Sequence, residues 1–422
     1  MQNRTFTRYE VFIIAILTFL QFTIILDFMV LSPLGVILLK ELNITTSQFG
    51  MVVSAYAFSA GASGLLAAGF ADKFDRKKLL MFFYTGFVIG TLLCGIASSY
   101  EFLLIARIVT GIFGGVIGSI AFAIVTDLFR MEVRGRVMGF LQMAFAGSQV
   151  LGVPIGFYMA NKIDWHAPFI MIVIVSVIVG VFIVIYMKPI DEHLKIPNKA
   201  NPLMHLFKTI SNSNYLKGFA ATVLLATGGF MLMPFASAYS VNNLGIEQDS
   251  LTTLYVITGV CSMAAGPIIG KLSDSIGKFT MFLIGTLLTI AIVLVYCHLG
   301  VTPFWIVVLV SVVMFVGVSS RMISSSALFS AVPEPKDRGA YMGVNSSIMQ
   351  ISGGIATFIA GLIVIQSPGG RLERYDVLGY VVSGSMVITI IMMYILHLYV
   401  KKKIAAEKAS PVQQPQVVPA EH

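Results

Sequence analysis

Long apolar segments separated by short polar breaks run along the whole chain. Six of these segments precede a polar stretch at 188–213 and six follow it. A helix needs roughly 20 apolar residues to cross the hydrocarbon core of a bilayer, and each segment is of that order. The pattern therefore predicts twelve transmembrane helices, at 11–39, 48–71, 79–98, 102–126, 137–160, 167–187, 215–241, 251–273, 279–299, 304–329, 340–365 and 376–399.

The amino-acid composition also indicates that lipid surrounds this chain. Hydrophobic residues make up 57% of the sequence and charged residues only 11%, and the mean hydropathy is +0.88. A soluble domain carries about 25% charged residues. A chain this apolar cannot hide its surface from water, so a polytopic membrane protein is predicted.

The basic residues lie almost entirely on one side of the predicted membrane. If both termini are cytoplasmic, the cytoplasmic segments hold 22 of the 28 Lys and Arg residues and the opposite side holds four. Cytoplasmic loops of membrane proteins carry such an excess. This distribution accounts for the net charge of +8 without a nucleic-acid partner. It predicts a multi-pass protein of the cell inner (plasma) membrane with both termini cytoplasmic.

The two halves repeat with a nearly constant offset. Pro33 corresponds to Pro234, Asp72 to Asp274 and Arg134 to Arg338, at shifts of 201, 202 and 204. Parallel repeats of six helices are typical of transporters with a binding site between the halves. The repeat predicts an N-terminal six-helix bundle at 1–187, a cytoplasmic central loop at 188–213 and a C-terminal six-helix bundle at 214–400. The Pro- and Gln-rich remainder, 401–422, is predicted to be a disordered cytoplasmic tail.

Two loops carry a family resemblance. The chain reads AGFADKFDRKKLL from Ala68 and GKLSDSIGKF from Gly270. Both resemble the signature loop of the major facilitator superfamily, although Ala68 and Asp75 stand where its pattern has glycines. Span 4 carries Arg107-x-x-Thr110-Gly111, which resembles the span-4 arginine motif of that superfamily.

Span 5 narrows the resemblance to a branch of the superfamily. Its Gly147, Gly152, Pro154 and Gly156 are similar to the Gly-Pro motif of proton-linked exporters. The chain thus looks closest to the twelve-helix drug/proton antiporters (sugar/drug efflux). The resemblance implies an all-α membrane protein whose twelve transmembrane helices form two pseudo-symmetric six-helix bundles.

Charged residues at the predicted cytoplasmic helix ends are candidate gate residues. The resemblance implies that Asp72, Arg76 and Asp127 form a charged latch that holds spans 2, 4 and 11 together. The helix N-terminus after Arg338 would favour a nearby carboxylate such as Asp72. The alternative is that these charges simply mark the ends of spans. The full set of gate candidates is Asp72, Arg76, Asp127, Arg134, Asp274 and Arg338.

Three ionisable residues lie well inside predicted spans: Asp27, Arg107 and Arg321. A charge at the bilayer centre costs about 2.5–3.5 kcal/mol, so such residues are usually functional. Asp27 and Arg107 lie at similar depth, and in the resembled fold spans 1 and 4 line the central cavity. Burial raises the pKa of any carboxyl group and a nearby guanidinium lowers it, so movement of an arginine can load and unload a proton. We predict that Asp27 is the proton acceptor and Arg107 its switchable partner. A permanent structural ion pair is the alternative.

The remaining polar and flexible residues inside spans are candidates for the substrate cavity. Arg321 could bind an anionic group of a substrate, or its side chain could reach toward the cytoplasm. Glutamine and asparagine in facing positions of spans 5 and 11 could bind substrate or one another. A Met/aromatic wall around Pro234 suits amphipathic substrates, with packing as the alternative. These candidates are Gln142, Gln149, Met231, Phe235, Arg321, Asn345 and Gln350. Segment 201–210 has helical spacing and predicts an interfacial helix.

No catalytic constellation, metal cluster or phosphate-binding loop is recognisable in the sequence. We therefore expect no enzyme activity, no cofactor and no metal. The first hypothesis is a proton-coupled antiporter that exports small amphipathic or drug-like molecules by alternating access. The second is a proton-coupled symporter that imports a sugar, organic acid or amino acid, and the third is a non-transporting membrane sensor on the same fold. Expected partners are a small-molecule substrate, protons and membrane lipid, without nucleic acid, and a monomer is expected.

Overall fold

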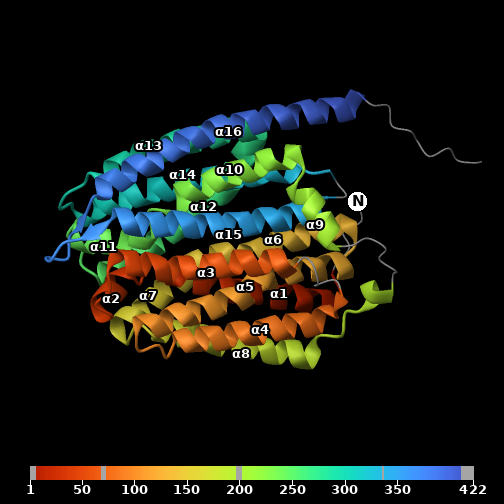
Figure 1. The fold of residues 1–422 in the computed structure, drawn as a ribbon, viewed down its shortest axis with the longest axis horizontal. Coiled ribbons are helices and arrows are strands. Elements are labelled where there is room, and N and C mark those ends of the chain that lie inside the picture. The colour runs from red at the N-terminus through yellow and green to blue at the C-terminus, as the bar shows by residue number, and fades with distance from the viewer. Residues whose placement is uncertain (1–5, 68–72, 196–201, 335–336, 410–422) are drawn as a thin grey trace, which may run out of the picture.

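The structure is a computed structural model that describes residues 6–67, 73–195, 202–334 and 337–409. Within these ranges the chain folds almost entirely into helices (Figure 1). Twelve helical stretches of the described chain are long and apolar enough to cross a membrane. The prediction of an all-α protein with twelve spans is therefore confirmed.

The helices follow one another with short connections. The first half contains α1 (Arg8–Val30), α2 (Gly35–Glu41), α3 (Thr46–Ala67), α4 (Arg76–Cys94), α5 (Tyr100–Leu128), α6 (Met131–Gly147), α7 (Val153–Lys162) and α8 (Ala167–Tyr186). The second half contains α9 (Pro202–Ile210), α10 (Ser213–Phe230), α11 (Ala236–Asn242), α12 (Ser250–Ile276), α13 (Lys278–Cys297), α14 (Phe304–Ala331), α15 (Arg338–Ile363) and α16 (Tyr375–Ala409). Short 3₁₀ turns lie at Glu192–Lys195 and Met233–Phe235, and a π-helical turn lies at Ser148–Gly152.

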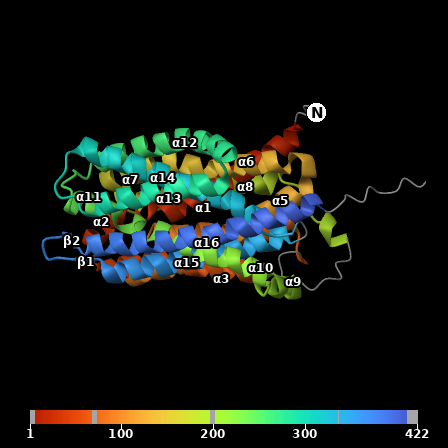
Figure 2. The same cartoon turned by 90° about the horizontal axis from the view of Figure 1, so that it is seen from above.

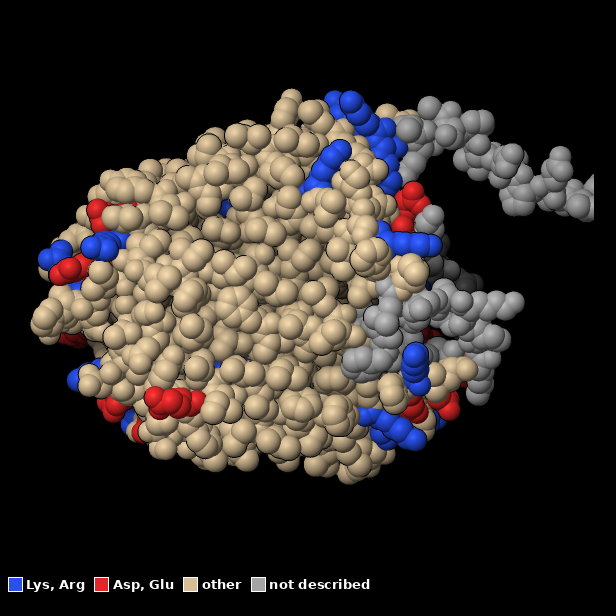
Figure 3. Space-filling model, viewed as in Figure 1, with Lys and Arg blue, Asp and Glu red and all other residues tan. Residues whose placement is uncertain are grey.

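The two ends of the bundle differ. Strands β1 (Ile365–Gln366) and β2 (Leu372–Glu373) pair as an antiparallel hairpin at one end, which we call the hairpin end (Figure 2). The other end carries the N-terminus, α9 and the last turns of α16, and we call it the basic end. Most charged side chains visible in Figure 3 gather at these two ends and leave a broad uncharged band between them. This band has the character of a lipid-facing surface.

Spans 1 and 7 are broken helices rather than continuous ones. Proline lacks the backbone N–H that a helix needs and clashes with the preceding turn. Accordingly α1 ends before Pro33 and α2 begins at Gly35, while Pro234 lies in the 3₁₀ turn between α10 and α11. The two breaks meet, because a Cβ atom on Gly35 would lie 2.9 Å from the carbonyl oxygen of Pro234. Equivalent positions of the sequence repeat thus contact one another across the halves.

Small residues allow the two halves to approach closely along α3 and α15, which lie side by side in Figure 1. A Cβ atom on Gly50 would lie 3.3 Å from the Cα atom of Gly361. A second contact joins α12 to the π-helical turn of span 5, where a Cβ atom on Gly259 would lie 3.0 Å from the Cα atom of Val150. Close backbone contacts of this kind hold helices together where lipid provides no hydrophobic driving force.

The predicted tail needs a correction. Residues 401–409 continue α16 as a helix rather than forming a disordered segment, and residues 410–422 lie outside the described residues. Lysine, alanine and glutamate in this stretch are strong helix formers. In addition, the Lys403 ammonium donates hydrogen bonds to the carbonyls of Val332 (3.1 Å) and Pro333 (2.7 Å) just after α14. These contacts fix the helix against the bundle.

The predicted interfacial helix lies at the basic end as α9. Residue 201, the first of the predicted segment, lies outside the described residues, and the helix begins at Pro202. Met204 and Phe207 are exposed on it. An exposed apolar face at the end of a membrane bundle suits a position at the lipid headgroups.

Candidate functional site

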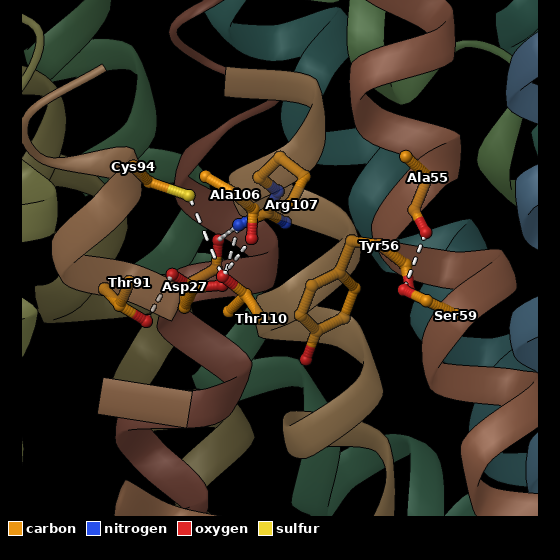
Figure 4. Close-up of polar contacts among 9 residues, drawn as sticks. All are labelled: Asp27, Ala55, Tyr56, Ser59, Thr91, Cys94, Ala106, Arg107 and Thr110. Carbon is orange, nitrogen blue, oxygen red and sulfur yellow. Dashed lines mark hydrogen bonds and ion pairs between the residues drawn. The ribbon is translucent and has the colours of Figure 1, made fainter. Parts of the chain in front are cut away.

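A buried ion pair lies inside the first half of the molecule. The Arg107 guanidinium on α5 donates from Nη1 to Oδ2 of Asp27 on α1 at 2.7 Å (Figure 4). Both side chains are completely buried, with 0% exposure. Sequence analysis predicted these two residues as partners from their similar depth, and the structure brings them into direct contact.

Two further helices complete the surroundings of this pair. The Thr91 hydroxyl on α4 donates to the other carboxylate oxygen, Oδ1 of Asp27, at 3.2 Å. The Tyr56 ring on α3 lies under the guanidinium, with 4.6 Å between its centroid and the Arg107 Cζ atom. A cation over an aromatic face is attracted by the ring quadrupole. Oδ2 of Asp27 and the Tyr56 ring therefore hold the arginine from two sides, while Thr91 holds the other carboxylate oxygen.

The arginine is not fully satisfied by these contacts. Neither Nε nor Nη2 of Arg107 has a hydrogen-bond partner among the described residues. Burying a charged group with unmet hydrogen bonds is unfavourable. The site therefore retains donors that no described residue uses.

Glycines on the helix faces let the four helices close around the pair. A Cβ atom on Gly90 of α4 would lie 2.8 Å from the Cα atom of Thr110 on α5. On the other side of α5, a Cβ atom on Gly111 would lie 2.5 Å from the Tyr56 carbonyl oxygen. Only glycine permits this spacing, and it brings Arg107 within reach of both Asp27 and Tyr56.

A layer of aromatic side chains separates the ion pair from the space between the halves. The Tyr56 ring packs on Phe28 at 5.5 Å between centroids, and Phe28 packs on Phe230 of α10 at 6.0 Å. A small cavity lies beyond this layer, lined by Phe28, Val53, Ala57, Phe230, Gln350, Gly353 and Thr357. The resemblance implied that spans 1 and 4, which carry Asp27 and Arg107, line the central cavity. In this conformation the two side chains face the interior of the first half instead, with Tyr56 and Phe28 as the barrier.

The cavity candidates have different surroundings. Gln350 lines the small cavity between the halves. Asn345 is 8% exposed and accepts a hydrogen bond from the Thr222 hydroxyl at 2.5 Å, within the second half. Gln142 is exposed on α6, and Gln149 is half-buried in the π-helical turn. Among the described residues no hydrogen bond joins these glutamines to Asn345 or Gln350.

The two candidates of the predicted Met/aromatic wall are buried in packing contacts. Met231 is 1% exposed and Phe235 is 0% exposed. The Phe235 ring packs on Phe49 of α3, 6.0 Å between centroids, and so joins the two halves. Neither residue borders the cavity described above.

Arg321 lies in the core of the second half. Its side chain on α14 is 2% exposed, so it does not reach out to the basic end, which was one of its two predicted states. Its Nε and Nη2 atoms have no hydrogen-bond partner among the described residues. An enclosed guanidinium with unused donors agrees with the other prediction, a site for an anionic group.

The gate candidates make contacts at the basic end. Arg76 Nε pairs with Asp127 Oδ2 at 2.9 Å, which joins the start of α4 to the end of α5. Arg134 caps the end of α5 by donating to the carbonyls of Phe129 (2.8 Å) and Thr126 (2.6 Å). Orphan carbonyls at a helix end need such donors. The Arg76–Asp127 pair thus links spans 3 and 4, whereas the predicted latch involved spans 2, 4 and 11.

The remaining gate candidates make no described contact between the halves. Asp274 pairs with Lys278, four residues along the chain, and Arg338 is exposed at the start of α15. Asp72, which would connect to span 11, lies outside the described residues. The latch therefore stays a prediction.

Sequence reasoning did not identify Thr91 and Tyr56 as parts of the site. Thr91 lies in an apolar segment that also contains Tyr84 and Thr85, and an uncharged tyrosine such as Tyr56 is ordinary in a span. Their spacing carries no signal, because they reach the ion pair from helices whose rotation is set by packing. Only the three-dimensional arrangement distinguishes them.

Comparison with known proteins places the chain in a family. The profile of the Major Facilitator Superfamily matches residues 17–302 and 218–420, so the chain belongs to this superfamily. It is 27% identical over 270 residues to the Uncharacterized MFS-type transporter YceJ of Bacillus subtilis (strain 168), which covers 64% of this chain and 68% of the relative. It is 35% identical over 148 residues to Multidrug resistance protein 3 of the same organism, covering 35% of this chain and 29% of the relative.

A solved structure supports the fold. The crystal structure of D-xylose-proton symporter superposes with a TM-score of 0.72 at 15% identity, covering 90% of this chain and 97% of that chain. At this identity the likeness shows the fold alone. Together with the family match and the twelve spans, it defines a multi-pass membrane transporter of the major facilitator superfamily.

Proposed function

We propose that this transporter is a proton-coupled antiporter that exports small amphipathic or drug-like molecules by alternating access. The observation that carries the proposal is the completely buried Asp27–Arg107 pair. Asp27 is the only carboxylate in the interior of the twelve predicted spans, since Asp376 is the first residue of the span 376–399. It is therefore the one acidic side chain at membrane depth available to carry a proton.

The chemistry of the pair supports a switch. Separating a buried ion pair leaves an uncompensated charge and costs about 3–5 kcal/mol. When a proton from water binds the Asp27 carboxylate, the acid becomes neutral and its attraction to Arg107 falls. The arginine keeps its contact with the Tyr56 ring, so it need not leave the site. Loss of the proton restores the ion pair.

The aromatic barrier supplies a link between proton and substrate. Phe28 contacts Tyr56 on the side of the ion pair and lines the small cavity on the other side. An amphipathic molecule that enters this cavity would push on Phe28 and Phe230. We propose that Gln350 forms a hydrogen bond with the polar group of this molecule. In other conformations of the transport cycle the substrate is proposed to contact Gln142, Gln149, Asn345, Met231 and Phe235.

The two bundles, 1–187 and 214–400, are the proposed moving units. The basic end is proposed to be cytoplasmic, with both termini inside and the protein a monomer in the cell inner membrane. The excess of basic residues at that side supports this orientation. Asp72, Arg76, Asp127, Arg134, Asp274 and Arg338 are proposed to act as its gate.

Flux measurements in proteoliposomes test the direction and the coupling. A pH gradient of each sign is imposed, and uptake of a lipophilic cation, a neutral drug or a sugar is recorded. Antiport predicts accumulation against the proton gradient and its loss in Asp27→Asn, while exchange without a gradient persists. Asp191→Asn, an exposed carboxylate outside the spans, is the matched control and keeps wild-type flux. Accumulation in the same direction as the protons would establish symport instead.

A further inference from the structure

A second buried arginine lies in the membrane interior, and no ion pair joins it to a carboxylate of the described residues. Arg321 is 2% exposed in the core of the second half, and its Nε and Nη2 atoms lack hydrogen-bond partners among the described residues. Arg107 in the first half has the Asp27 carboxylate at 2.7 Å. The buried guanidinium of the first half thus has a carboxylate beside it, whereas that of the second half has none among the described residues.

The second half cannot supply the missing negative charge. Helices α10, α11, α13, α14 and α15 contain no Asp or Glu. The acidic residues of α12 and α16, Asp274, Asp376 and Glu407, lie near the ends of those helices. A lone cation at this depth is costly, and charges within spans normally pair. The described part of the second half therefore offers Arg321 no carboxylate partner, and a group from outside the chain can take this place.

The repeat shows where such a partner would lie. The shift of 201 that relates Pro33 to Pro234 also relates Asp27 to Gly228 on α10. A Cβ atom on Gly228 would lie 3.1 Å from Nη2 of Arg321 and 3.4 Å from the Ser385 hydroxyl on α16. The second half thus has a glycine where the first half has its carboxylate. The Arg321 guanidinium reaches this glycine although the shifts of 201 to 204 relate Arg321 to residues 117–120 and not to Arg107.

We propose that Arg321, with Gly228 and the Ser385 hydroxyl beside it, binds a single monovalent anionic group. The group is either the carboxylate of an amphipathic substrate or a free inorganic anion. The guanidinium supplies two unused donors, and charge-assisted hydrogen bonds to an anion are among the strongest that a protein makes. Ser385 now donates to the Val382 carbonyl at 2.8 Å, and rotation of its hydroxyl adds a third donor. The inference rests on the proposed transport function only where the anion is part of a substrate.

Thermal unfolding of the full-length protein in detergent tests the site. The probes are sodium chloride, sodium salicylate and the neutral isostere salicylamide, in low-salt zwitterionic buffer. A ligand that binds only the folded state raises Tm in a saturable way. We expect this rise with at least one of the two anions and not with salicylamide. A response to salicylate alone identifies a carboxylate-bearing substrate, and saturation by chloride with competition from salicylate identifies a free anion.

Three variants locate the response. Arg321→Gln removes it, and Arg321→Lys weakens it because an ammonium lacks the planar fork of donors. Gly228→Asp supplies an internal carboxylate, so the response is lost while Tm without anion is unchanged or higher. Gly229→Ala is the matched control, since nothing lies within 4 Å of a Cβ atom at that position, and it responds as the wild type does.

Two outcomes overturn the inference. One is the absence of a saturable shift with either anion in the wild type, and the other is a shift of equal size in Arg321→Gln. The Asp27→Asn protein is expected to respond to anions normally. Failure of proton coupling and failure of the anion site are therefore distinguishable.

Discussion

At the residue scale, the molecule is organised around charges placed where lipid surrounds the protein. Asp27 and Arg107 neutralise each other, and Thr91 and Tyr56 hold them in one geometry. The remaining unused donors of Arg107 show that the geometry is not saturated. The proposed proton switch requires a pair that holds its geometry and still has donors free for a new partner, and both features are present here.

Removing one member of the pair is predicted to destabilise the protein. In Arg107→Gln the Asp27 carboxylate stays buried without a cation, at a cost of about 3–5 kcal/mol in unfolding free energy. The double variant with Asp27→Asn recovers part of this loss, because no charge is then buried. Lowering the pH relieves the single variant by protonating the carboxylate. Thermal or denaturant unfolding at two pH values measures these effects, and wild-type stability of Arg107→Gln at neutral pH would contradict them.

The charged residues of the site could be predicted from the sequence, but their surroundings could not. Asp27, Arg107 and Arg321 stand out because a charge within an apolar segment is rare. Thr91 and Tyr56 are uncharged and common in such segments. The enclosure of Arg321 depends on which way α14 is rotated, and the apolar pattern of a lipid-exposed helix fixes that rotation poorly.

At the scale of elements, close helix contacts position the site. Helix α5 carries Arg107 and packs against α3 through glycines. A Cβ atom on Gly115 would lie 2.2 Å from the Ala60 carbonyl oxygen, which is backbone and cannot move aside. The separation of α3 and α5, and with it the contact of Arg107 with Tyr56, depends on this position.

We predict that Gly115→Ala separates α3 from α5 and lowers stability by about 1–3 kcal/mol, as overpacking does. Gly118→Ala on the same helix is the control, because its Cβ atom would meet only Gln21 Nε2 at 3.8 Å. Unfolding curves of both variants measure the difference. Equal stability of the two would show that the helices can move apart without cost.

The positions of most helices could be predicted from the sequence. The breaks within helices could be predicted only in part. Apolar segments predicted all twelve spans, because length and hydropathy decide whether a helix crosses a bilayer. Pro33 and Pro234 marked two of the breaks. The π-helical turn at Ser148–Gly152 was not predicted, although Pro154 follows it closely and cannot donate a backbone hydrogen bond to the turn. The turn packs on Gly259.

At the scale of the whole molecule, polar contacts join the two halves at the hairpin end. Lys162 Nζ donates to Asp249 Oδ2 at 2.8 Å, and Asn161 Nδ2 donates to Oδ1 at 2.5 Å. Gln248 donates to Asn161 at 2.6 Å. These residues connect the end of span 5 to the start of span 8. Their contacts hold the two halves together at this end, and we call this contact the closure of the hairpin end.

The closure at the hairpin end is predicted to depend on the charge of Asp249. Hydrogen bonds from Lys162 and Asn161 hold the pKa of Asp249 below its ordinary value. Because this pKa is lowered, the charged Asp249 stabilises the contact between the halves at neutral pH. This stabilisation is lost as the pH falls through the pKa of Asp249. Exposed ion pairs contribute little, so we expect a shift in population rather than full opening.

Spin labels at Ile163 and Val301, both exposed near this end, report the closure after the three native cysteines are replaced. Asp249→Asn at neutral pH is expected to shift the label distances upward, as acid does in the unmodified sequence. Acid should then have no further effect on that variant. Unchanged distances in Asp249→Asn would exclude the closing role.

Proton release on ligand binding tests the central claim most directly. Purified wild type and Asp27→Asn are mixed in weakly buffered detergent solution with lipophilic cations, neutral drugs, sugars and salicylate, and the released protons are counted. The account predicts release by one ligand class in the wild type and none in Asp27→Asn, which still binds. Ligand binding without proton release in the wild type, or release that persists in Asp27→Asn, would contradict Asp27 as the proton carrier.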